Sequence, residues 1–181
     1  ILTYASGQEY KAPVNQRMTY NINSDWKLKI GDIPNAKNFN FDDSSWQPVT
    51  LPHAFNEDEA FRVHIKELTD TVVWYRKHFH LPNSDKGKKL FIEFEGVHFA
   101  AEVYLNGTFI GLHENGVMAF GFDISSNINY DGDNVLAIRV DNSWNYHEKS
   151  TNSTFQWNNK NFNANYGGIP KNVFLHVTGS V

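Results

Sequence analysis

Short runs of β-branched and aromatic residues recur along this chain, and each run is bounded by Gly, Asn, Asp or Pro. Runs of this length are typical of β-strands, while the residues that bound them favour turns. No long helical pattern interrupts the series. The clearest expected strands are 26–30, 72–81, 89–95, 100–105, 117–123, 134–141 and 172–178. Seven or more short strands without crossover helices predict an all-β sandwich.

Turn signals indicate that neighbouring strands are antiparallel. Asn106-Gly107 lies between two apolar runs, and both residue types tolerate the positive φ that a type I′ hairpin turn requires. Asn115-Gly116 and Asp131-Gly132 are two further turn signals. The centre of the chain therefore reads as a succession of hairpins.

A chain of 181 residues has room for one domain with a substantial core. Its composition is globular, with 40% hydrophobic and 20% charged residues. We expect a single β-sandwich domain over 1–181, with its core at about 17–181 and an irregular leader at 1–16.

Charge and composition exclude several classes of partner. A net charge of −4 gives no attraction to phosphate backbones or anionic membranes. No apolar stretch is long enough to span a bilayer, so neither nucleic acid nor membrane is an expected partner. The absence of cysteine excludes disulfides and thiolate metal sites, and it is compatible with the cytosol or a bacterial envelope.

Two stretches are irregular. The segment 38–61 has turn residues around one short expected strand at 46–50. The segment 142–168 holds eight Asn residues together with several Trp, Tyr and Phe residues. Loops of this length are usually functional or disordered, and this many aromatic residues argue against disorder.

No catalytic or metal-binding pattern stands out. Glu93 and Glu95 share one face of an expected strand whose other face carries Ile92 and Phe94, which indicates a solvated face over a buried one. The histidines have no ligand spacing such as HExxH, and the acidic residues have no EF-hand spacing. We therefore expect no catalytic residue, no metal ion and no cofactor in this chain.

Ten short segments, in order and in register, resemble the amino-terminal domain of glycoside hydrolase family 2, the family of β-galactosidases, β-glucuronidases and β-mannosidases. The resembling segments are Asp42-Asp43-Ser44-Ser45-Trp46, Leu51-Pro52-His53, Trp74-Tyr75-Arg76-Lys77, Phe94-Glu95-Gly96-Val97, Val103-Tyr104-Leu105-Asn106-Gly107, Gly111-Leu112-His113, Phe120 to Asp123, Gly132-Asp133-Asn134-Val135-Leu136, Val140-Asp141-Asn142 and Tyr166-Gly167-Gly168-Ile169. Pro170-Lys171 departs from the pattern, since relatives usually carry an aromatic residue and Arg there.

The resemblance implies a jelly-roll β-sandwich of the galactose-binding-domain-like type. In the family, an immunoglobulin-like domain and a TIM barrel follow, and the paired catalytic glutamates lie on the barrel. Neither downstream domain is in this sequence, so the fragment itself is expected to be inactive. The parent protein is expected to hydrolyse O-glycosyl bonds as a β-galactosidase-like enzyme, with a secreted or periplasmic location favoured over a cytoplasmic one.

The large aromatic residues of these segments have structural roles by size and spacing. Trp46, Trp74, Tyr75 and Phe94 are expected to fill the sandwich core. Arg76 and Asp141 are a candidate ion pair.

Sugar contacts are expected in the irregular tail. Amide groups bind sugar hydroxyls while aromatic faces cover the apolar side of the ring. Family 2 relatives lend a polar residue from about this region to the active site of the barrel. By position the polar candidates are Asn142, Asn145 and Asn163, and the candidate stacking surfaces are Trp144 and Trp157. Alternatively, these residues only order a long loop.

Three functions remain open. The first is an accessory domain that supports the barrel and completes its sugar pocket, with a β-galactoside or related glycan and the remaining domains of the same polypeptide as partners. The second is a free-standing carbohydrate-binding module, and the third is a structural sandwich. The first two differ in where Trp144 and Trp157 face, since a concave groove favours independent binding and a broad apolar patch favours a neighbouring domain.

Overall fold

The computed structural model describes residues 17–57, 71–114, 116, 118–143, 145–154 and 166–179. The expected leader at 1–16 lies outside these residues. The described elements are β1 (Met18–Asn21), β2 (Trp26–Ile30), β3 (Gln47–Val49), β4 (His53–Ala54), β5 (Val72–Phe79), η1 (Asn83–Asp85), β6 (Lys89–Phe94), β7 (Ala100–Leu105), β8 (Thr108–His113), β9 (Phe120–Asp123), η2 (Ser125–Asn127), β10 (Asn134–Asp141), β11 (Gly168–Ile169) and β12 (Val173–Thr178).

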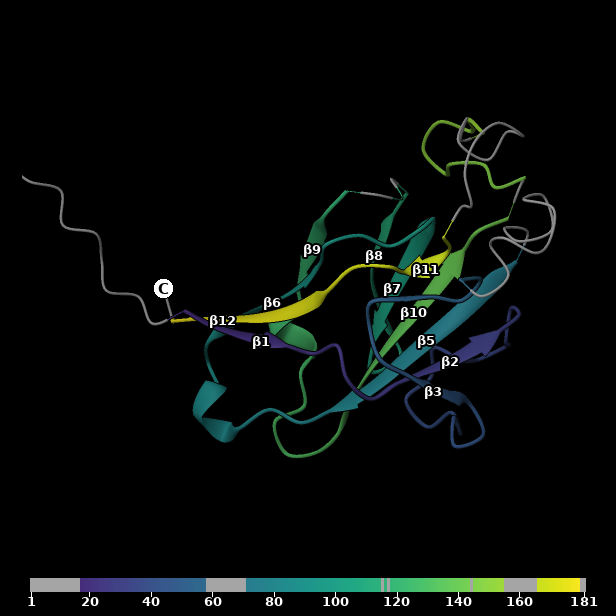
Figure 1. Ribbon diagram of the computed structural model, residues 1–181. Coiled ribbons are helices and arrows are strands. Elements are labelled where there is room, and N and C mark those ends of the chain that lie inside the picture. The colour runs from purple at the N-terminus through teal and green to yellow at the C-terminus, as the bar shows by residue number, and fades with distance from the viewer. Residues whose placement is uncertain are drawn as a thin grey trace, which may run out of the picture.

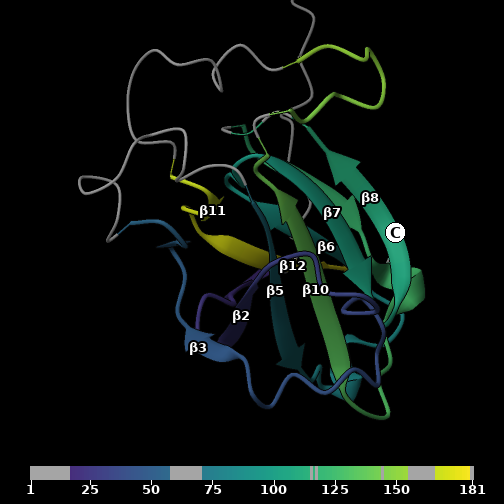
Figure 2. The ribbon, with the colours of Figure 1, turned by 90° about the vertical axis from the view of Figure 1, so that its right-hand side faces the viewer.

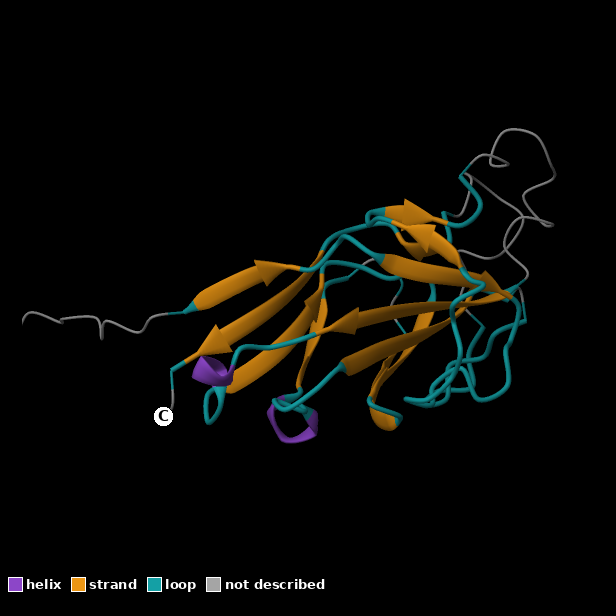
Figure 3. Cartoon of the chain, turned by 90° about the horizontal axis from the view of Figure 1, so that it is seen from below, coloured by secondary structure: helices purple, strands orange, loops and turns teal. Residues whose placement is uncertain are grey.

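The strands form two antiparallel sheets that face each other (Figures 1 and 3). One sheet has four strands in the order β1-β12-β6-β9, and the other has six in the order β3-β2-β5-β10-β7-β8. A two-stranded sheet, β11-β4, lies at one end. The expected all-β sandwich is confirmed, and within the described residues the helices are two 3₁₀ turns.

Alternation along the strands builds the core between the two sheets. In β6, Leu90, Ile92 and Phe94 are buried and point inward, while Phe91 and Glu93 between them are not buried. Full burial of such a side chain contributes about 1.5–3 kcal/mol relative to leaving it exposed. The expected division of this strand into a buried face and a solvated face is confirmed.

The hairpin between β7 and β8 has the predicted turn. Asn106 and Gly107 have φ values of 52° and 85°, so both positions adopt the left-handed backbone of a type I′ turn. The Asn106 side chain also donates to the carbonyl of Asn127 at 2.9 Å and accepts from the amide of Val135 at 2.8 Å. The turn is thereby attached to the loop that precedes β10.

The large aromatic residues divide between two clusters. Tyr75 and Phe94 lie in the main core, as expected. Trp46 and Trp74 are buried too, but they pack with Ala36 and Ala137 in a second cluster. Because side chains alternate along a strand, Trp74 points away from the face that carries Tyr75. The second cluster therefore lies on the outer face of the six-stranded sheet.

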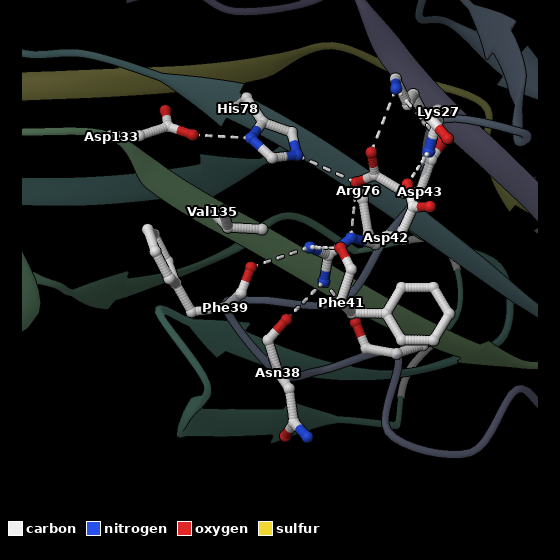
Figure 4. Close-up of polar contacts among 12 residues, drawn as sticks. Lys27, Asn38, Phe39, Phe41, Asp42, Asp43, Arg76, His78, Asp133 and Val135 are labelled. Atoms are coloured by element: carbon white, nitrogen blue, oxygen red, sulfur yellow. Dashed lines mark hydrogen bonds and ion pairs between the residues drawn. The ribbon is translucent and has the colours of Figure 1, made fainter.

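The expected pairing of Arg76 with Asp141 is wrong. Arg76 lies on the same outward row as Trp74, and its Nε donates to Asp43 Oδ2 at 2.7 Å (Figure 4). Asp141 instead pairs with Arg139, at 3.1 Å. The correct partner is 33 residues away in sequence, in the loop that covers this face.

Arg76 and Asp43 fasten the loop before β3 to the six-stranded sheet. The guanidinium of Arg76 is fully buried and donates to the carbonyl oxygens of Ala36, Asn38, Phe39 and Phe41. Four carbonyl acceptors and one carboxylate satisfy a buried guanidinium well. The loop is therefore held by hydrogen bonds that take the place of strand pairing.

Asp43 holds three cationic or donor side chains. Besides Arg76, its carboxylate contacts Lys27 Nζ at 3.0 Å and His78 Nε2 at 2.9 Å (Figure 4). Burial alone would raise the pKa of Asp43, but the hydrogen bonds from Arg76, His78 and Lys27 outweigh it and lower the pKa to about 2. The carboxylate thus stabilises the fold above the unfolded pKa of about 3.9, and its contribution is lost as the pH falls toward 2.

We expect Asp43→Asn to lower the free energy of unfolding by about 3–5 kcal/mol at pH 7, because it leaves the Arg76 guanidinium buried without its carboxylate. The variant should also lose less stability than the parent chain when the pH falls from 4 to 2. Urea unfolding at a series of pH values measures both effects.

Asp123→Asn is the matched control. The pKa of Asp123 is also lowered to about 2, by hydrogen bonds from Lys89 and Ser125, but this carboxylate is 42% exposed. Its replacement should cost less than about 1 kcal/mol at pH 7. Equal losses for the two variants would contradict the structural role of Asp43.

Candidate functional site

Several resembling segments converge at the end of the sandwich where β10 finishes and β11 pairs with β4 (Figures 1 and 2). We call this group the β4–β11 cluster. Its residues are His53, Tyr75, His98, Asn142, Gly167 and Gly168.

Two glycines bring the backbone segments of the cluster together. A Cβ at Gly168 would lie 2.3 Å from the Tyr75 hydroxyl and 3.0 Å from the His53 carbonyl oxygen, and the φ of Gly168 is +116°. A Cβ at Gly167 would lie 2.3 Å from Phe55 Cε1 and 2.6 Å from Asn142 Nδ2. Both positions therefore require the absence of a side chain, and Gly168 also requires its backbone freedom.

Tyr75 and His53 close one side of the cluster. The Tyr75 hydroxyl lies 3.0 Å from His53 Nδ1 and 3.3 Å from the His53 carbonyl oxygen. Burial raises the pKa of Tyr75, so the hydroxyl stays protonated. A core tyrosine thus fixes the position of the short strand β4.

His98 and Asn142 close the other side. The backbone of His98 exchanges two hydrogen bonds with Gly168, at 2.8 and 2.7 Å. Its Nδ1 lies 2.9 Å from Asn142 Oδ1; because an amide oxygen only accepts, Nδ1 carries the proton. Burial lowers the pKa of His98 despite the opposing effect of this hydrogen bond, so the ring is neutral at pH 7.

Asn142, a predicted sugar-contacting residue, lies at the base of the tail. Its side chain is fully buried, and its backbone amide donates to Thr71 at 3.0 Å. Its Nδ2 is a buried donor that has no hydrogen-bond acceptor in the described part of the chain. An unsatisfied buried amide donor costs about 1–3 kcal/mol.

The segment after Asn142 folds back on itself beyond the cluster, in the yellow-green region of Figure 1. His147 and Thr154 form an antiparallel bridge. The Tyr146 hydroxyl donates to Glu114 at 2.5 Å, and Lys149 Nζ donates to Glu102 at 2.7 Å. Contacts to the six-stranded sheet and the chain after β8 therefore give residues 145–154 a defined position.

The other predicted site residues differ in what can be said of them. Asn145 is exposed and lies three residues beyond Asn142 in sequence. Trp144, Trp157 and Asn163 lie outside the described residues, so the way the two tryptophans face is untested. Tyr166 is 41% exposed and directly precedes the glycine pair.

Sequence reasoning missed His98 and Tyr166 as members of this end of the molecule. His98 carries no motif, although it directly follows the resembling segment that ends at Val97. Tyr166 is part of a resembling segment, and the two glycines after it are a signal for a close backbone approach at this point.

This end of the molecule has one buried amide donor without an acceptor in the described chain, Asn142 Nδ2, and the exposed ring of Tyr166 beside the cluster. The described residues hold no group of three or more His, Cys, Asp or Glu side chains placed to bind a metal ion. Within the same residues, no helix is long and apolar enough to cross a membrane. The chemistry that this end supports is hydrogen bonding and ring stacking.

Alanine substitutions at Gly168 and Gly87 should lower the stability of the domain by different amounts. We expect Gly168→Ala to lower the free energy of unfolding by about 2–5 kcal/mol, because a steric clash adds to backbone strain. Gly87 has a φ of +83° and nothing within 4 Å of a Cβ, so Gly87→Ala should cost only the backbone strain, about 1–2 kcal/mol. Urea unfolding of the two variants checks this order, and equal costs would rule out the close approach to Tyr75.

The chain matches the family model described as glycosyl hydrolase 2 galactose-binding domain-like over residues 48–175. It is 39% identical over 170 residues to a β-glucuronidase of Formosa agariphila, covering 90% of this chain and 17% of that protein. It is 33% identical to the β-galactosidase BoGH2A of Bacteroides ovatus, covering 93% of this chain and 19% of that protein.

A solved structure of a β-glucuronidase from glycoside hydrolase family 2 aligns with a TM-score of 0.77 at 36% identity, over 93% of this chain and 18% of that one. The chain thus spans less than a fifth of the length of these relatives. With matched sequence segments, sandwich topology and a family model in agreement, the chain belongs to the galactose-binding-like amino-terminal domain family of glycoside hydrolase family 2.

Proposed function

We propose that this chain is the amino-terminal sugar-binding and accessory domain of a β-galactosidase-like family 2 glycoside hydrolase. In this role it supports the catalytic domain and lends residues to the glycan pocket. The observation that carries the proposal is the arrangement at the β4–β11 cluster, where a buried hydrogen-bonded base holds a defined polar segment at residues 145–154.

A residue that one domain contributes to the active site of another must be held in place by its own domain. Groups that bind a sugar at a neighbouring active site must be positioned without the help of that site, because a loosely held group loses affinity when it is ordered. Here the hydrogen bond between Asn142 and His98 fixes the chain just before the segment, and the hydrogen bond from Tyr146 to Glu114 fixes the segment itself. These contacts are all within the described chain.

The proposed sugar contacts are Asn142, Trp144, Asn145, Trp157 and Asn163, and they divide by position. Asn145 is exposed, so its amide is free to bind a hydroxyl group directly. Asn142 is buried, so it acts at the base, where its unpaired Nδ2 is available to a group brought in by the rest of the polypeptide. Tyr166 adds an exposed ring at the same end.

The catalytic chemistry belongs, in this proposal, to a later part of the polypeptide. The relatives carry more than four-fifths of their length outside the matched region. Hydrolysis of a glycosidic bond needs two carboxyl groups across one sugar pocket. The proposed partners are a β-galactoside or related glycan and the remaining domains.

Two measurements test the proposal. In the full-length parent enzyme, Asn145→Ala should lower kcat/KM for its glycoside by about tenfold, as expected for the loss of one sugar hydrogen bond of about 1.4 kcal/mol. Asn152→Gly is the control, because Asn152 is exposed on the same segment, its hydrogen bonds within the described chain use only backbone atoms, and glycine tolerates its φ of 56°. It should leave kcat/KM within about twofold.

Isothermal titration of the isolated chain with galactose, lactose and plant oligosaccharides separates the accessory role from an independent binding module. We expect no measurable heat, because the pocket is completed only beside the catalytic domain. Saturable binding by the isolated chain that is lost in Tyr166→Ala or Trp157→Ala would instead favour a free-standing carbohydrate-binding module. An Asn145→Ala enzyme of normal kcat/KM would contradict the lent-residue role.

A further inference from the structure

Lys77 lies on the face of β5 whose other side chains belong to the core or pack against it. In β5, Val73 and Tyr75 belong to the main core, and Phe79 packs against it. Side chains two residues apart point to the same face of a strand, so Lys77 points between the two sheets. It is only 6% exposed.

The charge of Lys77 is poorly compensated by the described residues. Its Nζ donates to the carbonyl oxygen of Ser24 at 2.7 Å, which uses one of three ammonium donors. Across the described ranges, no carboxylate is close enough to form an ion pair with it. Burial lowers the pKa of Lys77, and the charge of nearby Asp25 only partly opposes this effect.

A cavity of about 260 Å³ that opens to solvent has Lys77 in its lining. It opens between β1 and β12 of one sheet and the end of β5 in the other, where Figure 1 shows these strands close together. Apolar walls come from both sheets, including Tyr20, Phe79, Leu81 and Leu175. A volume of this size is slightly below that of sites for drug-sized ligands, which begin at about 300 Å³.

We propose that this cavity is a binding site for a small organic carboxylate, with Lys77 as the cationic anchor and the apolar walls around the body of the ligand. The observations fit a ligand that is charged at one end and apolar at the other, because the lining combines Lys77 with six apolar residues, and the polar residues Asn21, Ser24 and His80 complete it. A single ammonium group balances the one charge of a carboxylate, whereas it leaves half of the charge of a phosphate dianion unbalanced.

A binding role and a packing role of Lys77 predict different effects when the residue is replaced by an apolar one. A buried charge is costly, and replacement by an apolar side chain of similar length is often neutral or stabilising. If Lys77 only filled space, methionine would replace it without any further consequence. The proposed site predicts that Lys77→Met keeps the fold and loses the ligand.

The test uses benzoate and its neutral analogue benzamide, titrated into the whole 181-residue chain at pH 7 and followed by two-dimensional NMR of the backbone amides. Benzoate should shift the amides around Tyr20, Phe79 and Leu175 with a Kd on the order of 1 mM. Benzamide, which has the same shape without the charge, should bind at least about tenfold more weakly.

Two charge-removing variants and a control complete the experiment. Lys77→Met and Lys77→Gln should each weaken benzoate binding by at least about tenfold, with an unchanged or higher Tm for Lys77→Met. Lys29→Met removes an exposed lysine of the adjacent strand β2 and should bind benzoate like the parent chain.

Several results would overturn the proposal. Equal affinity for benzoate and benzamide would show a merely apolar cavity, and an equal loss in Lys29→Met would show a general charge effect. Unchanged binding in both Lys77 variants, or no saturable shifts up to about 20 mM benzoate, would exclude the site.

Discussion

The close approach of Gly168 to Tyr75 and His53 sets the architecture of one end of this domain. A Cβ at Gly168 would lie 2.3 Å from the Tyr75 hydroxyl, so β11 can reach β4 only where the side chain is missing. Once the two strands meet, the backbone of Gly168 pairs with His98, and His98 in turn holds Asn142 at the end of β10. A tight backbone contact in the core thereby determines where the polar segment beyond Asn142 emerges.

The outer face of the six-stranded sheet is held differently, by a charge network that lies beside the second aromatic cluster. Arg76 is buried beneath a loop and reaches its carbonyl oxygens, while Asp43 completes the arrangement. A buried guanidinium is stable only when its donors are satisfied, so the loop and the strand depend on each other. The domain is therefore stabilised in two ways. At one end, the backbone of Gly168 packs where no side chain fits, and on the outer face of the sheet the ion pair of Arg76 with Asp43 holds the loop.

The strands could be predicted from the sequence, whereas the long-range contacts of their side chains could not. Strand periodicity is a local property, so β2, β7 and β10 have the predicted bounds, and the turn at Asn106-Gly107 follows from its two residue types. The pairing of Arg76 could not be predicted, since its partner depends on how a distant loop lies over the sheet. The burial of Asn142 and the role of His98 depend on the same kind of long-range contact. The sequence motifs include Asn142 and Gly167-Gly168, but they do not predict that Asn142 packs against Gly167.

We propose that the β4–β11 cluster is a rigid base that presents residues 145–154 to a neighbouring glycan site. Native-state hydrogen exchange tests it most directly. We expect the amides of His98, Asn142 and Gly168 to exchange only through global unfolding, as slowly as amides at the centre of β10, while the amides of Glu148 and Asn152 exchange faster through local opening. Cluster amides that exchange as fast as those of Glu148 and Asn152 would contradict the account, because the base would then be no more stable than the segment it carries.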